Sequence, residues 1–324
     1  MVAPMVHPTL RPDGGARRAA RVGWRAAAVL LVLALSGCAW LIDKQHALAL
    51  RPTPGKPANF SGLRTGDEKM LVAVGEDVRP QRLAIWWLPH PDPRAPTLLY
   101  LHGSFRNLYQ NLPKIDALRE AGFAIVAVDY RGWGDSTPIV PSEATIVADA
   151  RRAWQEVLVR EPDPGRRVIY GHSMGGTVAV LLASELRHRE DYAALAIEST
   201  FTNLPELAAS AGFWGRVGAS LTTMRFDALE RIGDVDAPIW MLHGTADRTV
   251  PVALGRRLRD AAPPGVRWIE FEGGSHSRLH SQEGIAPRYQ ATFRELIASL
   301  EAARDDSQLG ASAPRSYPID GASP

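Results

Sequence analysis

The sequence is poor in cysteine and carries almost no net charge. Its 324 residues include one cysteine, Cys38, which excludes an internal disulfide and a cysteine-rich zinc site. The nine histidines lack the paired spacing of metal ligands, so we expect neither a metal nor another cofactor. The formal charge is +2, but the first 37 residues hold five arginines against one aspartate, so the remainder carries −2. We therefore expect no nucleic-acid partner. The sequence also shows no internal repeat.

The first 38 residues have the order of an export signal. Arginines come first, then the apolar run AAAVLLVLAL (26–35), then small residues before Cys38. Residues 35–38 resemble a bacterial lipoprotein signal, which implies cleavage after residue 37 and a lipid on Cys38. We therefore expect a domain in the periplasm, anchored by this lipid to a membrane of the cell envelope, with the outer membrane favoured. A free or buried thiol remains open, as does an uncleaved anchor, because the uncharged run 26–42 has 17 residues and approaches the length of a membrane span.

The remainder predicts one α/β domain over residues 64–303. The stretch RPTPGKPANFSG (51–62) is rich in proline and glycine, and we interpret residues 38–63 as a tether. Short apolar runs then alternate with helical patterns; after two strand-like pieces at 69–74 and 81–89, they lie at 97–103, 123–132, 166–173, 192–200, 237–245 and 266–274. Runs of this kind are typical of strands buried on both faces. The pattern predicts an α/β fold with a mostly parallel, doubly wound sheet covered by helices on both faces.

Helices are predicted between these strands. The clearest runs from Ser142 to about Arg160, with apolar residues on one face and Ser142 placed to cap it. Others fit 251–262 and 287–303. Residues 201–226 contain no strand and predict a small helical cap. The tail 304–324 ends in a small, polar, proline-bearing stretch, for which we expect disorder.

The segment VIYGHSMGGTVAV (168–180) places Ser173 between a strand and a helix. Its centre fits G-x-S-x-G, a turn on which the serine adopts strained backbone angles and needs glycine on both sides. Such a turn projects the hydroxyl into the crevice at the carboxyl end of the sheet. Small-residue turns also bind phosphate or serve only as connections. The segment alone therefore leaves a nucleophile and a simple turn as alternatives.

Two residues after later strands favour the nucleophile. A serine hydroxyl needs a base to take its proton and a third group to orient that base. Asp247 follows one strand and His276 follows the next, in the chain order Ser, Asp, His that this architecture uses. We therefore predict a catalytic triad of Ser173, Asp247 and His276.

Other polar residues are alternatives for these roles. His280 could replace His276 as the base, and Glu198 could replace Asp247 as the acid. Four more residues end strands and are interpreted as structural supports for loops: His102, His243, Asp129 and Asp135.

The oxyanion of an acyl-transfer intermediate needs two backbone N–H donors. One is predicted at Met174, the residue after the nucleophile. The second is predicted in the loop after strand 97–103, at Ser104 first and Phe105 second.

Four motifs resemble those of the α/β-hydrolases: HGSF, DYRGWGDS, GHSMGG with HGTADRTVP, and GGSHS. The resemblance covers about residues 65–303. The stretch FDALERIGDVDAPIWMLHGTADRTVP and the short cap are similar to Bem46-like and acyl-protein thioesterase-like serine hydrolases. HGSF departs from that group, since it lacks the asparagine or alanine common after HG.

The resemblance implies hydrolysis of a carboxylic ester or thioester of a small or acylated substrate through an acyl-enzyme. A serine peptidase with the same triad, or a lipoprotein that has kept the fold only as a binding module, are the alternatives. A haloalkane dehalogenase is disfavoured, because its nucleophile is a carboxylate and this chain has Ser173 there. Acyl-chain length, leaving group and oligomeric state are not encoded in a readable pattern.

Overall fold

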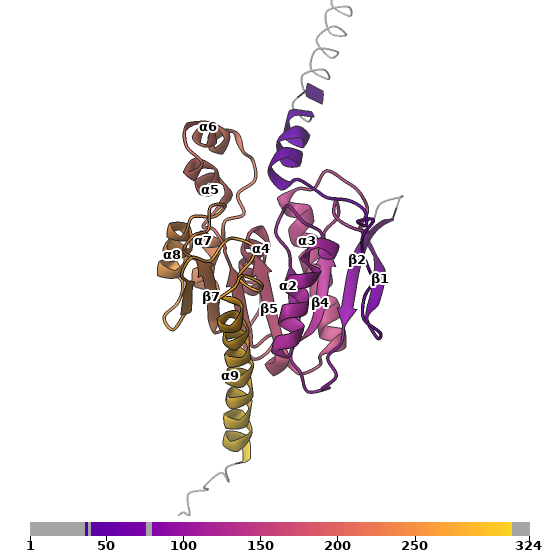
Figure 1. Cartoon of the computed structure of the whole chain (residues 1–324), viewed down its shortest axis with the longest axis vertical. Helices are drawn as coiled ribbons and strands as arrows, with labels where there is room; N and C mark the ends of the chain where they lie inside the picture. Colours follow the sequence, from indigo (N-terminus) through magenta and orange to yellow (C-terminus); the bar gives the residue numbers. More distant parts are fainter. Residues whose placement is uncertain (1–35, 38–39, 76–79, 313–324) are drawn as a thin grey trace, which may run out of the picture. The chain divides into compact units, whose positions relative to one another are not determined.

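A computed structural model describes residues 36–37, 40–75 and 80–312 (Figure 1). The chain divides into two units, Met1–Gln45 and His46–Pro324. Cys38 and nearly all of the expected signal lie outside the described residues. Among the helices that are described, none has the length and hydrophobicity needed to cross a membrane. The sheet, the cap and the candidate site all belong to the second unit.

One eight-stranded sheet forms the centre of this unit, in the order β1-β2-β4-β3-β5-β6-β7-β8. Its strands are β1 (Glu68–Val74), β2 (Gln81–Leu88), β3 (Thr97–Leu101), β4 (Ala124–Asp129), β5 (Arg167–His172), β6 (Ala194–Glu198), β7 (Ile239–Gly244) and β8 (Arg267–Phe271). Strands β3 to β8 run parallel, and β2 is antiparallel to both β1 and β4. This confirms the predicted α/β sheet.

Helices cover both faces of the sheet, which is why the central strands β3, β4 and β6 are buried along their whole length (Figure 1). One core contains residues of α3 (Glu143–Arg160), α4 (Met174–Ala183) and α8 (Val252–Ala261). The opposite core contains residues of α2 (Leu108–Ala121) and α9 (Ala286–Ser312), which pack against each other. Because parallel strands end at one edge, this arrangement gathers the loops that follow β3, β5, β7 and β8.

The helix termini follow local sequence signals. Ser142 caps α3, and its side chain accepts a hydrogen bond from the backbone N–H of Thr145, as predicted. Helix α2 was not anticipated, because Pro113 lies inside it and its apolar periodicity is weak. Its start is nevertheless encoded by a capping box between Asn107 and Gln110.

The region 201–226 contains two short helices, α5 (Leu204–Ser210) and α6 (Phe213–Leu221), which pack against each other. A further short helix, α7 (Ala228–Arg231), and the 3-10 turn η2 (Ile232–Asp234) lead into β7. Another 3-10 turn, η1 (Pro164–Arg166), precedes β5. The cap is therefore small and helical.

The expected tether is largely part of the body. Residues 46–50 are helical and Leu50 is buried. The Gly55 amide donates to the Gly134 carbonyl over 2.7 Å, and the Asn107 side chain donates to the carbonyls of Thr53 and Gly55. The segment rich in proline and glycine therefore runs along the body, because its backbone groups are hydrogen-bonded to neighbouring loops.

Residues 304–312, for which disorder was expected, are helical, because α9 continues to Ser312. No proline interrupts the sequence from Arg288 to Ala313, so the helix can extend. Arg304 contributes an ion pair of 2.8 Å with Asp163. Residues 313–324 lie outside the described part.

Candidate active site

Ser173 sits on a strained turn between β5 and α4. Its φ of 57° and ψ of −121° are unusual for a residue with a side chain. A Cβ on Gly171 would come within 2.1 Å of the Gly175 carbonyl oxygen, and a Cβ on Gly175 within 2.1 Å of the Leu101 carbonyl oxygen. Glycine is therefore required on both sides of the serine, as the sequence pattern indicated.

The structure brings the three predicted triad side chains together. Ser173 Oγ lies 3.1 Å from His276 Nε2, and His276 Nδ1 lies 2.7 Å from Asp247 Oδ2. These distances allow two successive hydrogen bonds from serine to histidine to aspartate. The residues come from three loops at the carboxyl edge of the sheet, after β5, β7 and β8.

The surroundings of Asp247 stabilise the negative charge of its carboxylate. Its Oδ1 accepts hydrogen bonds from the amides of Thr249 and Val250, at 2.9 and 2.8 Å. Burial alone would raise the pKa of Asp247, but the hydrogen bonds from His276 and Val250 hold it below its ordinary value. The carboxylate is thus ionised and fixed opposite His276 at neutral pH.

The loop after β3 carries the predicted second oxyanion donor. A Cβ on Gly103 would lie 3.2 Å from the Ser173 Cβ, so this loop passes close to the serine. His102 Nδ1 donates to the Gly103 carbonyl over 2.6 Å, and Trp133 Nε1 donates to the Ser104 carbonyl over 2.7 Å. Since N–H and C=O point in opposite directions across a trans peptide, these bonds orient the amides of Ser104 and Phe105.

The other predicted donor, the amide of Met174, is the first of α4. The first amides of a helix have no carbonyl partner within that helix, so this one is free to bind an anion. Met174, Ser104 and Phe105 line one small cavity together with Ser173.

His172 supports the site and was not singled out from the sequence. Its Nε2 donates to the main-chain carbonyl of His276 over 2.9 Å, and the two imidazole centroids are 4.9 Å apart. Burial, followed by the nearby Lys114, lowers the pKa of His172 well below its ordinary value, so the ring is neutral. A neutral histidine therefore anchors the backbone of His276.

Glu198 does not take the place of Asp247. It forms a buried ion pair with Lys114 and also accepts hydrogen bonds from Tyr170 and Tyr289, at 2.6 and 3.0 Å. Burial lowers the pKa of Lys114. Burial would raise the pKa of Glu198, but the Lys114 ammonium holds it below its ordinary value. This pair lies 84 residues apart in sequence, and no local pattern could have shown it.

His280 does not take the place of His276. It makes no hydrogen bond to Ser173 or Asp247, and its Nδ1 is buried without a hydrogen-bond partner. Burial is the main cause that lowers its pKa to about 4, so it is neutral at physiological pH.

The remaining strand-end residues support loops, as interpreted from the sequence. His243 Nε2 donates to the Val250 carbonyl over 2.9 Å, behind Asp247. Asp129 Oδ1 accepts the Leu108 amide over 2.8 Å, and Asp135 accepts a hydrogen bond from the Tyr109 hydroxyl.

Two cavities meet at Ser173. One, of about 290 Å³ and here called the polar cavity, is lined mostly by polar residues, among them Arg106, Asn111 and Ser277 beside Ser173 and His276. The other, of about 70 Å³, has a mostly apolar wall that includes Leu50, Leu204, Leu207, Phe201 and Phe226. Residues of the body and of α5 thus form the apolar wall. Leu50, which was expected to lie in the tether, is part of this wall.

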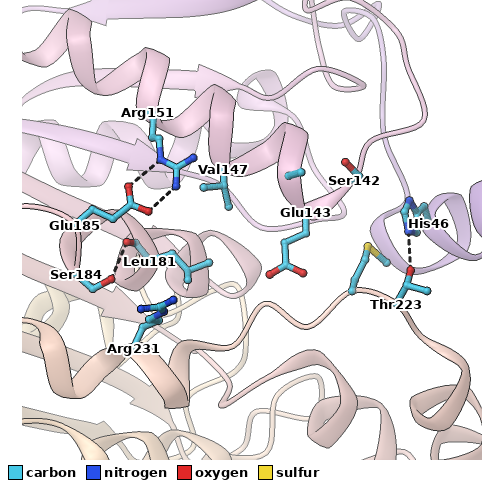
Figure 2. A pocket seen from close by; sticks show the side chains of 12 residues that line it. His46, Ser142, Glu143, Val147, Arg151, Leu181, Ser184, Glu185, Thr223 and Arg231 are labelled. Atoms are coloured by element: carbon cyan, nitrogen blue, oxygen red, sulfur yellow. Dashed lines mark hydrogen bonds and ion pairs between the residues drawn. The ribbon is translucent and has the colours of Figure 1, made fainter.

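A larger hollow, of about 740 Å³, does not contain Ser173 (Figure 2). Figure 2 shows Arg151 paired with Glu185 and His46 hydrogen-bonded to Thr223 in its wall. The Glu143 carboxylate there accepts the amides of Arg225 and Phe226. Most of its charged groups are thus paired with other protein groups. The serine, histidine and carboxylate side chains in its wall do not form a hydrogen-bonded series like that of Ser173, His276 and Asp247. Within the described ranges, no cluster of three or more potential metal ligands occurs.

Comparison with known proteins identifies relatives in sequence. A family model described as serine aminopeptidase, S33, matches residues 92–221. An uncharacterized protein of Mycobacterium tuberculosis is 32% identical over 259 residues, which are 78% of this chain and 89% of that protein. Lysophosphatidylserine lipase ABHD12 of Danio rerio is 34% identical over 194 residues, 55% of this chain and 50% of the lipase.

Solved structures share the fold. An esterase of Pyrococcus furiosus superposes with a TM-score of 0.58 at 17% identity, over 76% of this chain and 96% of the esterase. Est1E of Butyrivibrio proteoclasticus, solved with ferulic acid, gives 0.56 at 16% identity, over 72% of this chain and 99% of Est1E. Together with the relatives found in sequence, these matches show that the chain belongs to the α/β-hydrolase family of serine hydrolases and is an enzyme.

Proposed function

We propose that the protein is a serine esterase that hydrolyses carboxylic esters of single acyl chains through an acyl-enzyme. The hydrogen-bonded series from Ser173 through His276 to Asp247 carries this proposal. The ABHD12 relatives, named lysophosphatidylserine lipases, support an ester substrate.

In the first half of the reaction, His276 Nε2 accepts the proton of Ser173 while Oγ attacks the ester carbonyl carbon. Asp247 holds the imidazole in position and stabilises its positive charge. The amides of Met174 and Ser104 donate to the carbonyl oxygen as it becomes negative. His276 then gives its proton to the leaving alcohol, and the acyl group stays on Ser173.

In the second half, His276 takes a proton from water, which attacks the acyl-enzyme and releases the carboxylic acid. The same steps would cleave a thioester. We favour an oxygen ester, because the ABHD12 relatives are named lipases. The apolar cavity beside Ser173 suits the acyl chain, because its wall is mostly hydrocarbon and lies next to the nucleophile.

An aminopeptidase is less consistent with the site, although the family model bears that description. An enzyme that binds a peptide amino terminus needs an acidic group near the nucleophile to pair with the ammonium. The polar cavity at Ser173 has no carboxylate in its wall and contains Arg106 instead. Arginine there repels an ammonium group.

The test is hydrolysis of p-nitrophenyl esters with acyl chains of two to sixteen carbons. Ser173→Ala should abolish turnover at every length, because the nucleophile is lost. Ser184→Ala is a matched control at the C-cap of the helix that follows Ser173, in the wall of the separate hollow of Figure 2. Turnover that survives in Ser173→Ala, or no hydrolysis of any ester by the wild type, would contradict the proposal and favour a binding module.

We also propose that a lipid on Cys38 holds the enzyme at the membrane, in the periplasm. The support is the order of the leader sequence, which places small residues directly before the one cysteine. Cys38→Ala should remain uncleaved or leave the membrane fraction. A variant that is processed and membrane-bound like the wild type would overturn this location.

A further inference from the structure

Helix α6 of the cap turns an apolar face toward solvent. Phe213 and Trp214 are 63% and 80% exposed, and Val217, about one helical turn further along, is 39% exposed. The other exposed large apolar residues of the described body, at positions 48, 71, 105, 140 and 159, come from separate segments. A surface helix ordinarily turns its apolar side toward the core, so this face of α6 needs an explanation.

The packing of α6 on α5 directs this face away from the body. A Cβ on Gly215 would come within 2.0 Å of the Ala208 carbonyl oxygen, so the Gly215 side of α6 lies directly on α5. In a helix of 3.6 residues per turn, Phe213 and Val217 lie almost opposite Gly215. Trp214 lies next to them. Figure 1 shows α5 between α6 and the sheet, so the apolar face points outward.

Helix α5 connects this face with the candidate active site. Leu204 and Leu207 of α5 line the apolar cavity beside Ser173. The axes of two packed helices are about 8–10 Å apart. A single helix therefore separates the exposed face of α6 from the cavity proposed for the acyl chain.

The chain that leads to Cys38 enters the body beside the same helix. Thr222 is the C-cap of α6, and the hydroxyl of the next residue, Thr223, lies 3.3 Å from His46 Nε2. Eight residues of chain lead from Cys38 to His46, and they span at most about 28 Å when fully extended. A lipid on Cys38, or an uncleaved leader, therefore limits how far α6 can lie from a membrane.

The charge of the cap suits a lipid surface. Residues 207–226 contain two arginines, Arg216 and Arg225, and neither aspartate nor glutamate. Arg225 pairs with Asp227, whereas Arg216 is exposed and has no carboxylate within ion-pair distance among the residues that the structure describes. Anionic head groups attract such a charge, and tryptophan prefers the level of the head groups.

We propose that α6 docks on the surface of a lipid bilayer, with Phe213, Trp214 and Val217 inserted at the boundary between head groups and acyl chains. Helices that lie in this boundary present an apolar face to the lipid and basic residues to the head groups. The attachment at Cys38 keeps the protein at the membrane, and α6 turns the cap toward it. This surface goes beyond the proposed esterase function, on which it rests only for the role of the apolar cavity.

The first measurement is fluorescence quenching of the purified full chain mixed with vesicles of phosphatidylcholine and phosphatidylglycerol whose acyl chains carry bromine. Bromine quenches an indole only at short range, so quenching reports insertion. The emission lost in brominated vesicles should be smaller for Trp214→Phe than for the wild type. The other tryptophans, including the exposed Trp40, are present in both proteins, so the difference belongs to Trp214.

The second measurement compares an ester held in the bilayer, 1-lauroyl-glycerol in vesicles, with the soluble ester p-nitrophenyl acetate. The double variant Phe213→Ser, Trp214→Ser should lose at least about tenfold in kcat/KM on the vesicle ester, because two rings no longer enter the lipid. Its kcat/KM on the soluble ester should stay at the wild-type value, which also shows that the variant is folded. The matched control is Val159→Ser, which changes a valine of α3 that is 75% exposed and should leave both values unchanged.

Equal quenching of the wild type and Trp214→Phe, or an unchanged rate of the double variant on the vesicle ester, would overturn the proposal. A wild type that dimerises in solution and becomes monomeric in the double variant, without quenching of Trp214, would also overturn it, because a second copy would then cover α6. If neither ester is hydrolysed, the proposed esterase function fails, and the quenching still decides whether α6 enters the bilayer. Mass spectrometry of Cys38 tests the lipid attachment separately.

Discussion

The Nε2 of His172 donates a hydrogen bond to the main-chain carbonyl of His276, 2.9 Å away. The histidine directly before the nucleophile therefore fixes the backbone of the proposed base. Since β5 is a buried central strand and the loop after β8 is not part of the sheet, the bond ties this loop to the centre of the sheet.

His172→Ala should lower kcat by about 10- to 100-fold with little change in KM, because His276 loses a constraint on its position while the substrate cavities remain. His172→Gln, which keeps a side-chain N–H donor, should recover part of the rate. Steady-state kinetics with one p-nitrophenyl ester provides the check. An unchanged kcat in His172→Ala would show that the hydrogen bond does not position the base.

Trp133→Phe should reduce kcat by about tenfold, because the Ser104 carbonyl loses its donor and the loop that carries the Ser104 amide is no longer held in place. The same change should cost about 1 kcal/mol in the free energy of unfolding, the usual value of one hydrogen bond. Kinetics and urea denaturation measure the two effects. A loss of stability with an unchanged kcat would remove Trp133 from the account of the oxyanion loop.

Lys114→Met should lower the free energy of unfolding by about 3–5 kcal/mol, because it leaves the carboxylate of Glu198 buried without a counter-charge. The double variant Lys114→Met, Glu198→Leu should recover much of this loss, since no buried charge then remains. Urea denaturation of the two variants tests the pair. Equal destabilisation in both would mean that packing, rather than charge, dominates at this position.

Asp129→Asn should gain stability relative to the wild type as the pH rises from about 4 to 8. Burial raises the pKa of Asp129 to about 8 in the folded state, above its ordinary value of 3.8. A raised carboxyl pKa contributes stability below the unfolded value and loses it as the pH rises through the folded value. Asparagine keeps an acceptor for the Leu108 amide but carries no charge. A difference in stability between the two proteins that stays constant from pH 4 to 8 would contradict the shift.

The fold was predictable because its signals are local. Continuous apolar runs mark the buried strands, and Ser142 marks the start of α3. Ser173, Asp247 and His276 could be predicted together because each follows a strand, and parallel strands end at one edge. These regularities concern neighbouring residues, so a single sequence displays them.

The supporting groups could not be predicted, because their partners are distant in sequence. Lys114 pairs with Glu198 across 84 residues, from a helix with a weak pattern. His172 occupies a variable position of the serine motif, and only the folded loop brings the His276 carbonyl to it. Residues 51–62 looked like part of a tether because their composition is that of a linker, whereas the backbone groups of Thr53 and Gly55 form hydrogen bonds with Asn107 and Gly134 of the body.

The most direct test of the account is labelling of the purified protein with a fluorophosphonate probe, followed by peptide mass spectrometry. We expect one modified residue, Ser173, and no labelling of Ser173→Ala, while Ser184→Ala is labelled like the wild type. Labelling that persists in Ser173→Ala, or a folded wild-type protein that is not labelled, would contradict the central claim that Ser173 is the activated nucleophile.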